Sequence, residues 1–416
     1  MKYSQTIRHT GLYILAAVVP AAISLFINPF VAKNMSPLDY ATVGYYNSFT
    51  TLFIPLISLY LTHYYSKRYY ECDEAGRKRL KALIYKVFFY ISPIITFTVG
   101  TGLWCYSHYF NPESSIQYFP YALIYLSTLY FQCFFTLELV DMKMRRQPLS
   151  YFKLSIIQSA IIISSTVLLV IILKWGAVGK LLAVLIEALI LFFAIFLRNI
   201  DLIRIRVTFN EIRDSLVFCF PLIIAAMLSF FTKGYDSILL ERLGNDVEFA
   251  NYTIGLQFSG YLGMITTALQ NTFQSDIYES IHQSNRKKTL KIFGLLFVST
   301  LFIVGIFCLL APVVVRILTY NRYTDAAPYA ILTSVSLVFS VSYYFLSTMF
   351  IARGRTKATL LNKIVVAAFT FVCYPLIIDR FEYVGGACAI SLAFFAGILG
   401  YLLLMKVNYA EDPKHR

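Results

Sequence analysis

The chain has 416 residues, of which 58% are hydrophobic and only 14% are charged, and its mean hydropathy is +0.66. Because soluble domains carry about 25% charged residues, this composition excludes an ordinary soluble protein and indicates an integral membrane protein. The seven cysteines are scattered without a CxxC pair or a Cys/His cluster. They predict no metal site and no disulfide framework, and no cofactor is expected.

Apolar runs recur along the whole chain, and each is long enough to cross ~30 Å of hydrocarbon, which takes about 20 helical residues. They predict twelve membrane helices, at residues 10–33, 40–64, 80–106, 116–142, 150–173, 177–198, 212–240, 248–276, 289–311, 326–352, 358–378 and 384–406. The first is interpreted as an uncleaved helix, since it is too long for a signal peptide and further spans follow it.

The net charge of +14 could indicate a nucleic-acid partner, but the 36 Lys and Arg residues lie mostly in alternate short breaks between the spans. Positively charged residues stay on the cytoplasmic side of a membrane. The opposite breaks hold only Lys33, Lys174, Lys180, Lys233, Arg242, Arg316, Arg322 and Arg380. We therefore expect a multi-pass protein with both termini in the cytoplasm and no nucleic-acid partner.

Two pairs of short motifs recur about half a chain apart. Residues 33–41 read KNMSPLDYA and residues 242–250 read RLGNDVEFA. Residues 145–179 begin with RRQ and end with WGAVG, and residues 353–387 begin with RGR and end with YVGGA. The shared order and offset predict a duplication. We expect two pseudo-symmetric six-helix lobes, residues 1–199 and 212–416, joined by a cytoplasmic linker at 200–211 and inserted the same way up.

Charged residues within the predicted spans are few, and each costs about 2.5–3.5 kcal/mol at a helix centre on insertion scales. Lys233 and Asp236 lie three residues apart in the seventh helix, on one helical face. They could form an internal ion pair or face a wet cavity. Glu187 lies near the middle of the sixth helix and is either a proton-coupling site or a neutral, hydrogen-bonded carboxyl group. Asp236 and Glu187 are the candidate ion-coupling residues.

Other polar residues lie at moderate depth in the predicted helices. Tyr46 and Asn47 fall about two turns inside the second helix, and Gln257 has a comparable depth in the eighth. Their amide and phenol groups could bond sugar hydroxyls, or could form interhelical hydrogen bonds instead. Glu138 and Asp141, near the cytoplasmic end of the fourth helix, are interpreted as part of a solvated charge cluster.

Three cations, Lys33, Arg242 and Arg316, are expected at or near periplasmic helix ends. Snorkelling towards the interface is the alternative to contact with a substrate. Lys33 and Arg242 occupy matching positions of the repeat, which makes them candidate substrate contacts.

No catalytic constellation is found. The chain lacks a GxxxxGK[ST] nucleotide loop, and the periplasmic breaks, of about ten residues, are too short for a catalytic loop with its own structure. The sequence therefore predicts a protein that is not an enzyme.

The nonapeptides at 33–41 and 242–250, together with RGRTK at 353–357 and YVGGA at 383–387, resemble the polysaccharide-biosynthesis, Wzx-type oligosaccharide flippases of the MATE/MOP superfamily. The resemblance covers essentially the whole chain. It implies an all-α, twelve-helix fold of the MOP flippase type in a bacterial inner membrane.

The resemblance also implies a function. The substrate would be an undecaprenyl-diphosphate-linked oligosaccharide, exported to the periplasmic leaflet before polymerisation into O-antigen of lipopolysaccharide, capsule or exopolysaccharide, with a polysaccharide polymerase as a partner. Helices one, two, seven and eight line the cavity in similar flippases. The expected substrate-binding residues are Lys33, Tyr46, Asn47, Lys233, Arg242, Gln257 and Arg316. We expect alternating access, with coupling to H+ or Na+ left open.

Three alternatives remain. A cation-coupled drug antiporter of the MATE type would share the fold. A major-facilitator sugar transporter also has twelve helices in two lobes, and residues 73–78, DEAGRK, partly match its loop between helices two and three. A membrane enzyme that acts on a lipid-linked sugar is the third, which the short periplasmic loops disfavour.

Overall fold

The computed structural model of the chain describes residues 19, 22–283, 285–353 and 355–410. These residues are almost entirely helical and contain no β-strand. Eight helices in this part of the chain are long and apolar enough to cross a membrane. The expected all-α membrane fold is confirmed. The chain divides into two compact units, Met1–Met227 and Leu228–Arg416.

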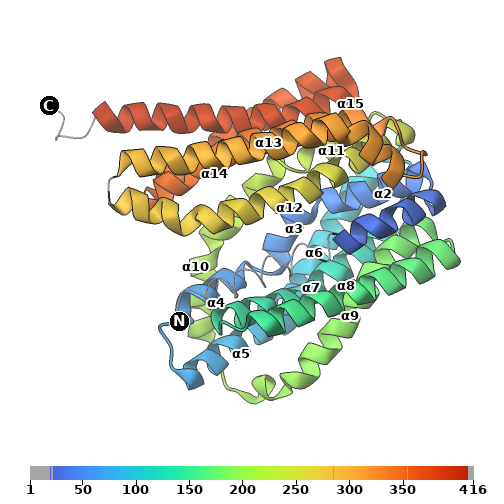
Figure 1. Cartoon of the computed structure of the whole chain (residues 1–416). Helices are drawn as coiled ribbons and strands as arrows, with labels where there is room; N and C mark the ends of the chain where they lie inside the picture. Colours follow the sequence, from blue (N-terminus) through green and yellow to red (C-terminus); the bar gives the residue numbers. More distant parts are fainter. Residues whose placement is uncertain (1–18, 20–21, 284, 354, 411–416) are drawn as a thin grey trace. The chain divides into compact units, whose positions relative to one another are not determined.

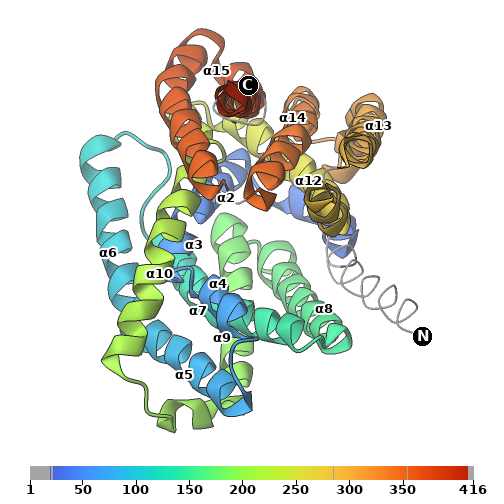
Figure 2. The same cartoon turned by 90° about the vertical axis from the view of Figure 1, so that its left-hand side faces the viewer.

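The first unit begins with helical residues 22–34. It continues with α2 (Pro37–Ser48), α3 (Thr50–Ile57), α4 (Leu61–Arg68), α5 (Glu74–Tyr90), α6 (Ser92–Cys105), the π-helix η1 (Tyr106–Phe110), α7 (Tyr121–Met144), α8 (Pro148–Thr166), the π-helix η2 (Val167–Ile172), α9 (Gly176–Arg198), the 3₁₀-helix η3 (Ile200–Arg204) and α10 (Phe209–Met227). Helix α9 packs against both α7 and α8, while α10 packs on α3, α4 and α5 (Figure 2).

The second unit contains the 3₁₀-helix η4 (Leu228–Phe231), α11 (Tyr235–Glu241), α12 (Asp246–His282), α13 (Arg286–Leu318), α14 (Ala326–Ala352) and α15 (Thr356–Ala410). Helix α15 consists of two helices that meet at Glu382, whose backbone is not helical (φ 48°, ψ −131°). Helix α14 packs against α12, α13 and α15, and these long helices lie side by side in Figures 1 and 2.

The second predicted helix, residues 40–64, is not continuous. It consists of α2, α3 and α4, and Leu59 and Tyr60 between α3 and α4 have positive φ angles of 48° and 54°. Within a membrane, backbone groups freed at such a break must find partners in the protein. The Ser92 hydroxyl of α6 donates to the Ile57 carbonyl oxygen at 2.6 Å. The break is therefore part of the packed structure of this unit.

The start of α5 explains the sequence pattern at residues 73–78. Asp73 caps this helix, because its carboxylate accepts a hydrogen bond from the Gly76 backbone N–H at 2.8 Å. Asp is one of the residues preferred at this position of a helix, and a Cβ atom at Gly76 would lie 2.8 Å from Asp73 Oδ1. The pattern therefore has a local structural cause, separate from the partial match to the major-facilitator loop.

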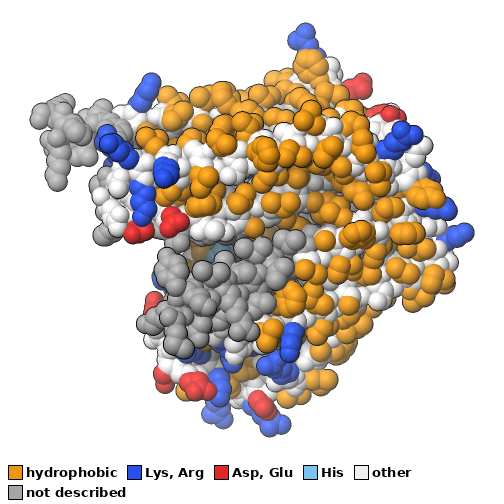
Figure 3. Space-filling model, viewed as in Figure 1, with side chains coloured by type: hydrophobic (Ala, Val, Ile, Leu, Met, Phe, Trp, Pro, Cys, Tyr) orange, Lys and Arg blue, Asp and Glu red, His pale blue; other side chains and the backbone are white. Residues whose placement is uncertain are grey.

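Helix α13 shows the surface expected of a membrane protein. Its outward side chains include Leu290, Phe302 and Leu309, which are 68%, 68% and 83% exposed. In Figure 3, hydrophobic side chains cover the flank of α13 and its neighbours, and Lys and Arg gather near the helix ends. This distribution fits an apolar belt in contact with lipid tails.

The predicted linker at 200–211 contains η3 and the start of α10. Since α10 packs within the first unit, the two compact units divide after Met227. These units are defined by how the helices pack, whereas the predicted lobes at 1–199 and 212–416 were defined by the repeat in the sequence. The lobes stay a prediction.

Candidate transport residues in each unit

A buried group of charged side chains joins three helices of the first unit. The Lys81 ammonium of α5 lies 2.6 Å from Glu138 Oε2 and 2.8 Å from Asp141 Oδ2, both on α7. Asp141 Oδ1 accepts a hydrogen bond from the Tyr65 hydroxyl of α4 at 2.7 Å and pairs with Arg145 at 2.8 Å. The side chains of the three central residues are at most 6% exposed.

This geometry corrects the expectation that Glu138 and Asp141 belong to a solvated cluster. They are buried because Lys81, from a different helix, supplies the opposite charge within the protein. The sequence held part of the signal, since Glu138, Asp141 and Arg145 lie three and four residues apart and so share one helical face. The group holds α4, α5 and α7 together, and the loss of one member would leave an uncompensated buried charge.

Glu187 lies within α9 and is 0% exposed. The amides of Gln158 on α8 and Gln132 on α7 face its carboxyl group. Neither carboxyl oxygen has a hydrogen-bond partner of good geometry in the described part of the chain. Because an unpaired charge is costly in such surroundings, this group is suited to hold a proton. The central position predicted for Glu187 in its helix agrees with the structure.

Two neighbouring residues of α2 have different surroundings. Tyr46 is 2% exposed, and its hydroxyl donates a hydrogen bond to the Gln117 carbonyl oxygen at 2.8 Å. Its ring centroid lies 5.7 Å from that of Tyr125 on α7. These contacts favour the interhelical alternative for Tyr46, which secures the segment before α7. Asn47, the next residue, is exposed.

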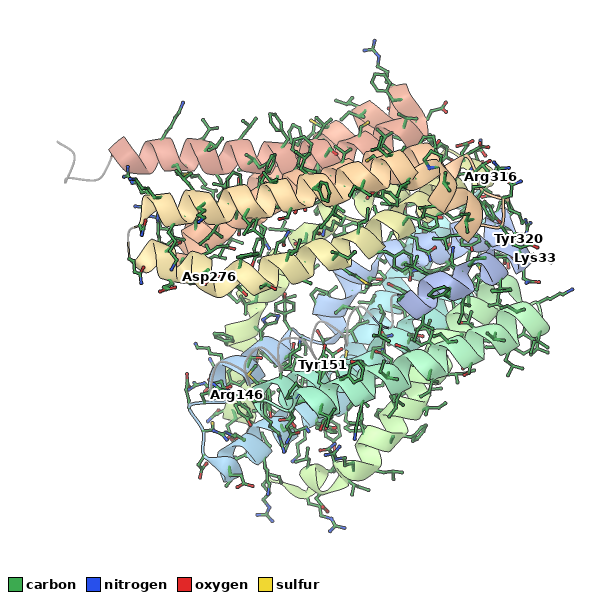
Figure 4. All side chains as sticks on the ribbon, viewed as in Figure 1. Lys33, Arg146, Tyr151, Asp276, Arg316 and Tyr320 are labelled. Atoms are coloured by element: carbon green, nitrogen blue, oxygen red, sulfur yellow. The ribbon has the colours of Figure 1, made fainter. Side chains whose placement is uncertain are left out.

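Lys33 lies near the end of the first described helix and is exposed. Figure 4 shows it beside the turn that leads into α2. Figure 4 also labels Arg146 and Tyr151, which lie at the opposite end of this unit, at the turn between α7 and α8 and in the first turn of α8.

In the second unit, Lys233 and Asp236 are separated by a break in the predicted seventh helix. Gly234 between them has φ 140°, and α11 begins only at Tyr235. The break corrects the expectation that the two residues share one face of a continuous helix. Asp236 is 1% exposed and accepts hydrogen bonds from the Gly234 N–H at 2.8 Å and from the Tyr252 hydroxyl of α12.

The ion-pair interpretation of Lys233 and Asp236 does not describe their geometry. The Lys233 ammonium lies 5.8 Å from the ring centroid of Phe394 on α15, whereas the Asp236 carboxylate is bonded to Tyr252 and Gly234. Tyr252 is the partner that the sequence did not reveal. Its position sixteen residues after Asp236, on a different helix, has no periodic signature.

Gln257, Arg242 and Arg316 are distributed over three elements of the second unit. The Gln257 amide of α12 donates to the Tyr261 hydroxyl at 2.9 Å. Arg242 caps the C-terminus of α11 and is exposed. Arg316 lies in the last turn of α13 and donates to the Asn321 side chain at 3.1 Å, close to Tyr320 in Figure 4. Asp276, also labelled in Figure 4, lies near the C-terminal end of α12.

The acidic residue at the seventh position of each repeated nonapeptide, Asp39 or Glu248, is bonded within its own unit. Asp39 accepts a hydrogen bond from the Ala177 backbone N–H of α9 at 2.7 Å. Glu248 of α12 accepts one from the Tyr329 hydroxyl of α14 at 2.6 Å. The recurrence of an acidic residue at this position of the sequence indicated neither partner.

No family model matches the chain. Protein 1 of the Lsg locus of Haemophilus influenzae is 23% identical over 419 residues, with 97% of each chain covered. Among solved structures, an inward-facing multidrug-resistance MATE transporter of the MOP superfamily has a TM-score of 0.69 at 15% identity, covering 95% of this chain and 98% of that one. The lipid II flippase MurJ, inward closed, has a TM-score of 0.67 at 16% identity, covering 94% and 87%.

This is the fold of the MOP-superfamily transporters. A further member from Pyrococcus furiosus Vc1, described by the reverse polarity of its binding pocket, has a TM-score of 0.64 at 16% identity, covering 97% of this chain and 96% of that one. The resemblance inferred from the sequence is confirmed at the level of the superfamily fold. Both drug transporters and a lipid II flippase have this fold, so the fold does not specify a substrate.

Proposed function

We propose that the protein is a flippase that exports an undecaprenyl-diphosphate-linked oligosaccharide from the cytoplasmic to the periplasmic leaflet of a bacterial inner membrane. The observation that carries the proposal is the pair of exposed cations, Lys33 and Arg242, at matching positions of the two repeats on a MOP fold. A diphosphate group requires cations to leave water. The lipid II flippase with this fold supports a lipid-linked substrate.

The remaining groups fit a carbohydrate attached to the diphosphate. Asn47 and Gln257 carry amides that can both donate to and accept from sugar hydroxyls. The lipid tail would stay in the bilayer while the headgroup crosses the membrane by alternating access. The product would then be polymerised, as O-antigen, capsule or exopolysaccharide, on the periplasmic side, with both termini of the flippase in the cytoplasm.

Two buried carboxyl groups are candidates for ion coupling. Glu187 in the first unit has no well-placed hydrogen-bond partner in the described chain, and Asp236 in the second is bonded to Tyr252 beside a broken helix. Broken helices are common at the ion sites of transporters. We propose H+ or Na+ as the coupling ion, with transport in vesicles under imposed gradients of each ion as the discriminating measurement.

A cation-coupled drug antiporter of the MATE type is the second candidate. The TM-score of 0.69 to a MATE transporter and the buried carboxyl group of Glu187 favour it. Accumulation of cationic dyes in cells that express the protein separates the two functions. Dye export together with no movement of lipid-linked oligosaccharide would favour the antiporter.

The flippase proposal is tested by reconstituting the protein in vesicles with a fluorescent undecaprenyl-diphosphate oligosaccharide. Lys33→Ala and Arg242→Ala should each lower the initial rate roughly 10–100-fold, because a hydrogen bond to a charged group contributes about 1.5–3 kcal/mol. The matched controls are Lys174→Ala and Arg380→Ala, which remove exposed cations of the same unit as each variant. If both variants retain full export at equal protein levels, the cationic-site argument fails.

A further inference from the structure

Each repeated nonapeptide carries an acidic residue six positions after its cation. Asp39 follows Lys33 in the first unit, and Glu248 follows Arg242 in the second. Each of these two carboxylates is bonded to a later helix of its own unit, 138 and 81 residues further along.

In the first unit, both oxygens of the Asp39 carboxylate have fixed donors. Oδ2 accepts from the Ser36 backbone N–H at 2.8 Å and from the Ser36 hydroxyl at 2.7 Å, which completes the cap of α2. Oδ1 accepts from the Ala177 N–H at 2.7 Å. A helix cap needs only the first set of bonds, so the bond to α9 has a separate purpose.

Gly176, the residue before Ala177, lies against this carboxylate. Gly176 has φ +53°, a conformation that L side chains rarely adopt. A Cβ atom there would come within 2.7 Å of Asp39 Cγ. The carboxylate therefore occupies the space of the missing side chain. Lys33 lies on the chain directly before this anchored turn.

In the second unit, Glu248 is likewise bonded to a later helix, but the donors are different. Glu248 Oε2 accepts from the Tyr329 hydroxyl of α14 at 2.6 Å. The Glu248 N–H donates to the Asn245 side-chain oxygen at 3.2 Å, and the Asn245 carbonyl oxygen accepts from the Tyr383 hydroxyl of α15 at 3.1 Å. The turn between Arg242 and α12 is thus tied to two later helices.

We propose that Asp39 and Glu248 are positioning residues, each of which fixes the turn that presents the substrate cation of its unit, Lys33 or Arg242. The inference rests on the proposed function, in which these two cations bind the diphosphate. Each acid acts through the turn and does not touch the substrate. Two units that use different donors for one purpose indicate that the anchoring itself is what both repeats require.

The cleanest variant is Tyr329→Phe, which removes one hydroxyl and leaves Glu248 and the fold of α14 in place. Vesicle transport of the fluorescent lipid-linked oligosaccharide should show a KM about 5–10-fold higher, with the rate at saturation within about twofold of the wild type. Glu248→Ala should match it, and Glu248→Gln, which keeps an acceptor oxygen, should recover most of the loss. The double variant of Tyr329→Phe and Glu248→Ala should be no worse than either single one.

In the first unit, Ala177→Pro removes the donor to Asp39 at a position in the first turn of α9, where proline is tolerated. It should raise the KM by a similar factor. Tyr85→Phe is the control, since Tyr85 is buried and its hydroxyl has no hydrogen-bond partner in the described chain. An unchanged KM in Tyr329→Phe and Ala177→Pro, or additive effects in the double variant, would overturn the proposal.

A measurement without substrate separates this inference from the proposed function. Amide hydrogen exchange of residues 242–248 should become at least about fivefold faster in Tyr329→Phe, and that of residues 33–39 should do so in Ala177→Pro. If the wild type fails to move the oligosaccharide, the flippase proposal fails. If exchange in both turns is unaltered, the positioning role fails whatever the substrate is.

Discussion

Replacing Lys81 by methionine tests the buried charge group of the first unit. The substitution keeps the length and apolar stem of the side chain but removes the charge that pairs with Glu138 and Asp141 at 2.6 and 2.8 Å. Two carboxylates would then share a buried site without Lys81. Removal of one partner from a buried ion pair costs about 3–5 kcal/mol.

This cost can be converted to a melting temperature. The first unit spans Met1–Met227, and an unfolding entropy of about 2.1 cal/mol/K per residue gives roughly 0.5 kcal/mol/K for this unit. A loss of about 3–5 kcal/mol therefore lowers Tm by about 6–10 °C. Thermal unfolding of the purified protein in detergent, followed by circular dichroism, measures the shift.

A control variant and a rescue variant show whether the fall in Tm comes from the buried charge group. Lys86→Met makes the same chemical change on the same helix, where Lys86 has no ion pair in the described chain, and should move Tm by less than about 2 °C. Adding Glu138→Gln and Asp141→Asn to Lys81→Met should restore part of the loss, because the two buried carboxylates that lost the Lys81 charge become neutral as well. A Tm of Lys81→Met equal to that of the control would refute the reasoning.

Two further predictions concern one position in each unit. Gly255→Ala should lower the free energy of unfolding by about 1–3 kcal/mol, because its Cβ would lie 2.7 Å from Tyr329 Cβ and 2.8 Å from the Ala330 nitrogen of α14. The control is Gly260→Ala on the same helix, which has no atom within 4 Å of its Cβ and should be neutral or stabilising in the same melting experiment. Equal losses at both positions would contradict the close approach of α12 and α14. Glu187→Gln should leave Tm unchanged or higher, since the amide is neutral without binding a proton. The same variant should abolish any dependence of transport on the proton gradient. A large fall in Tm would show that Glu187 is charged and paired.

The interfaces between helices illustrate what local sequence could not predict. Glu138 and Asp141 looked solvated because Lys81, their partner, lies 57 and 60 residues earlier in the chain. The Asp236 carboxylate was compared with Lys233 next to it, but it is bonded to Tyr252 on another helix. Such partners are chosen by how helices distant in sequence pack, and no periodicity within one helix records that choice.

Helix breaks were missed for a related reason. Hydropathy depends on residue type and contains no information on backbone conformation, so the apolar run across Leu59 and Tyr60 predicted one continuous helix. The break there is stabilised by Ser92 from another helix. Gly234, by contrast, was visible in the sequence as a residue that permits positive φ, and it could have warned that Lys233 and Asp236 do not share one helical face.

The sequence by itself determined the membrane environment and the helical fold. These follow from properties that add up along the chain: apolar run length must match the thickness of a bilayer, and backbone groups in lipid must bond within helices. The tertiary structure alone decided which polar groups meet. It anchored Asp39 to Ala177 and Glu248 to Tyr329, because a hydrogen bond depends on distances of about 3 Å that only the packing of whole helices can set.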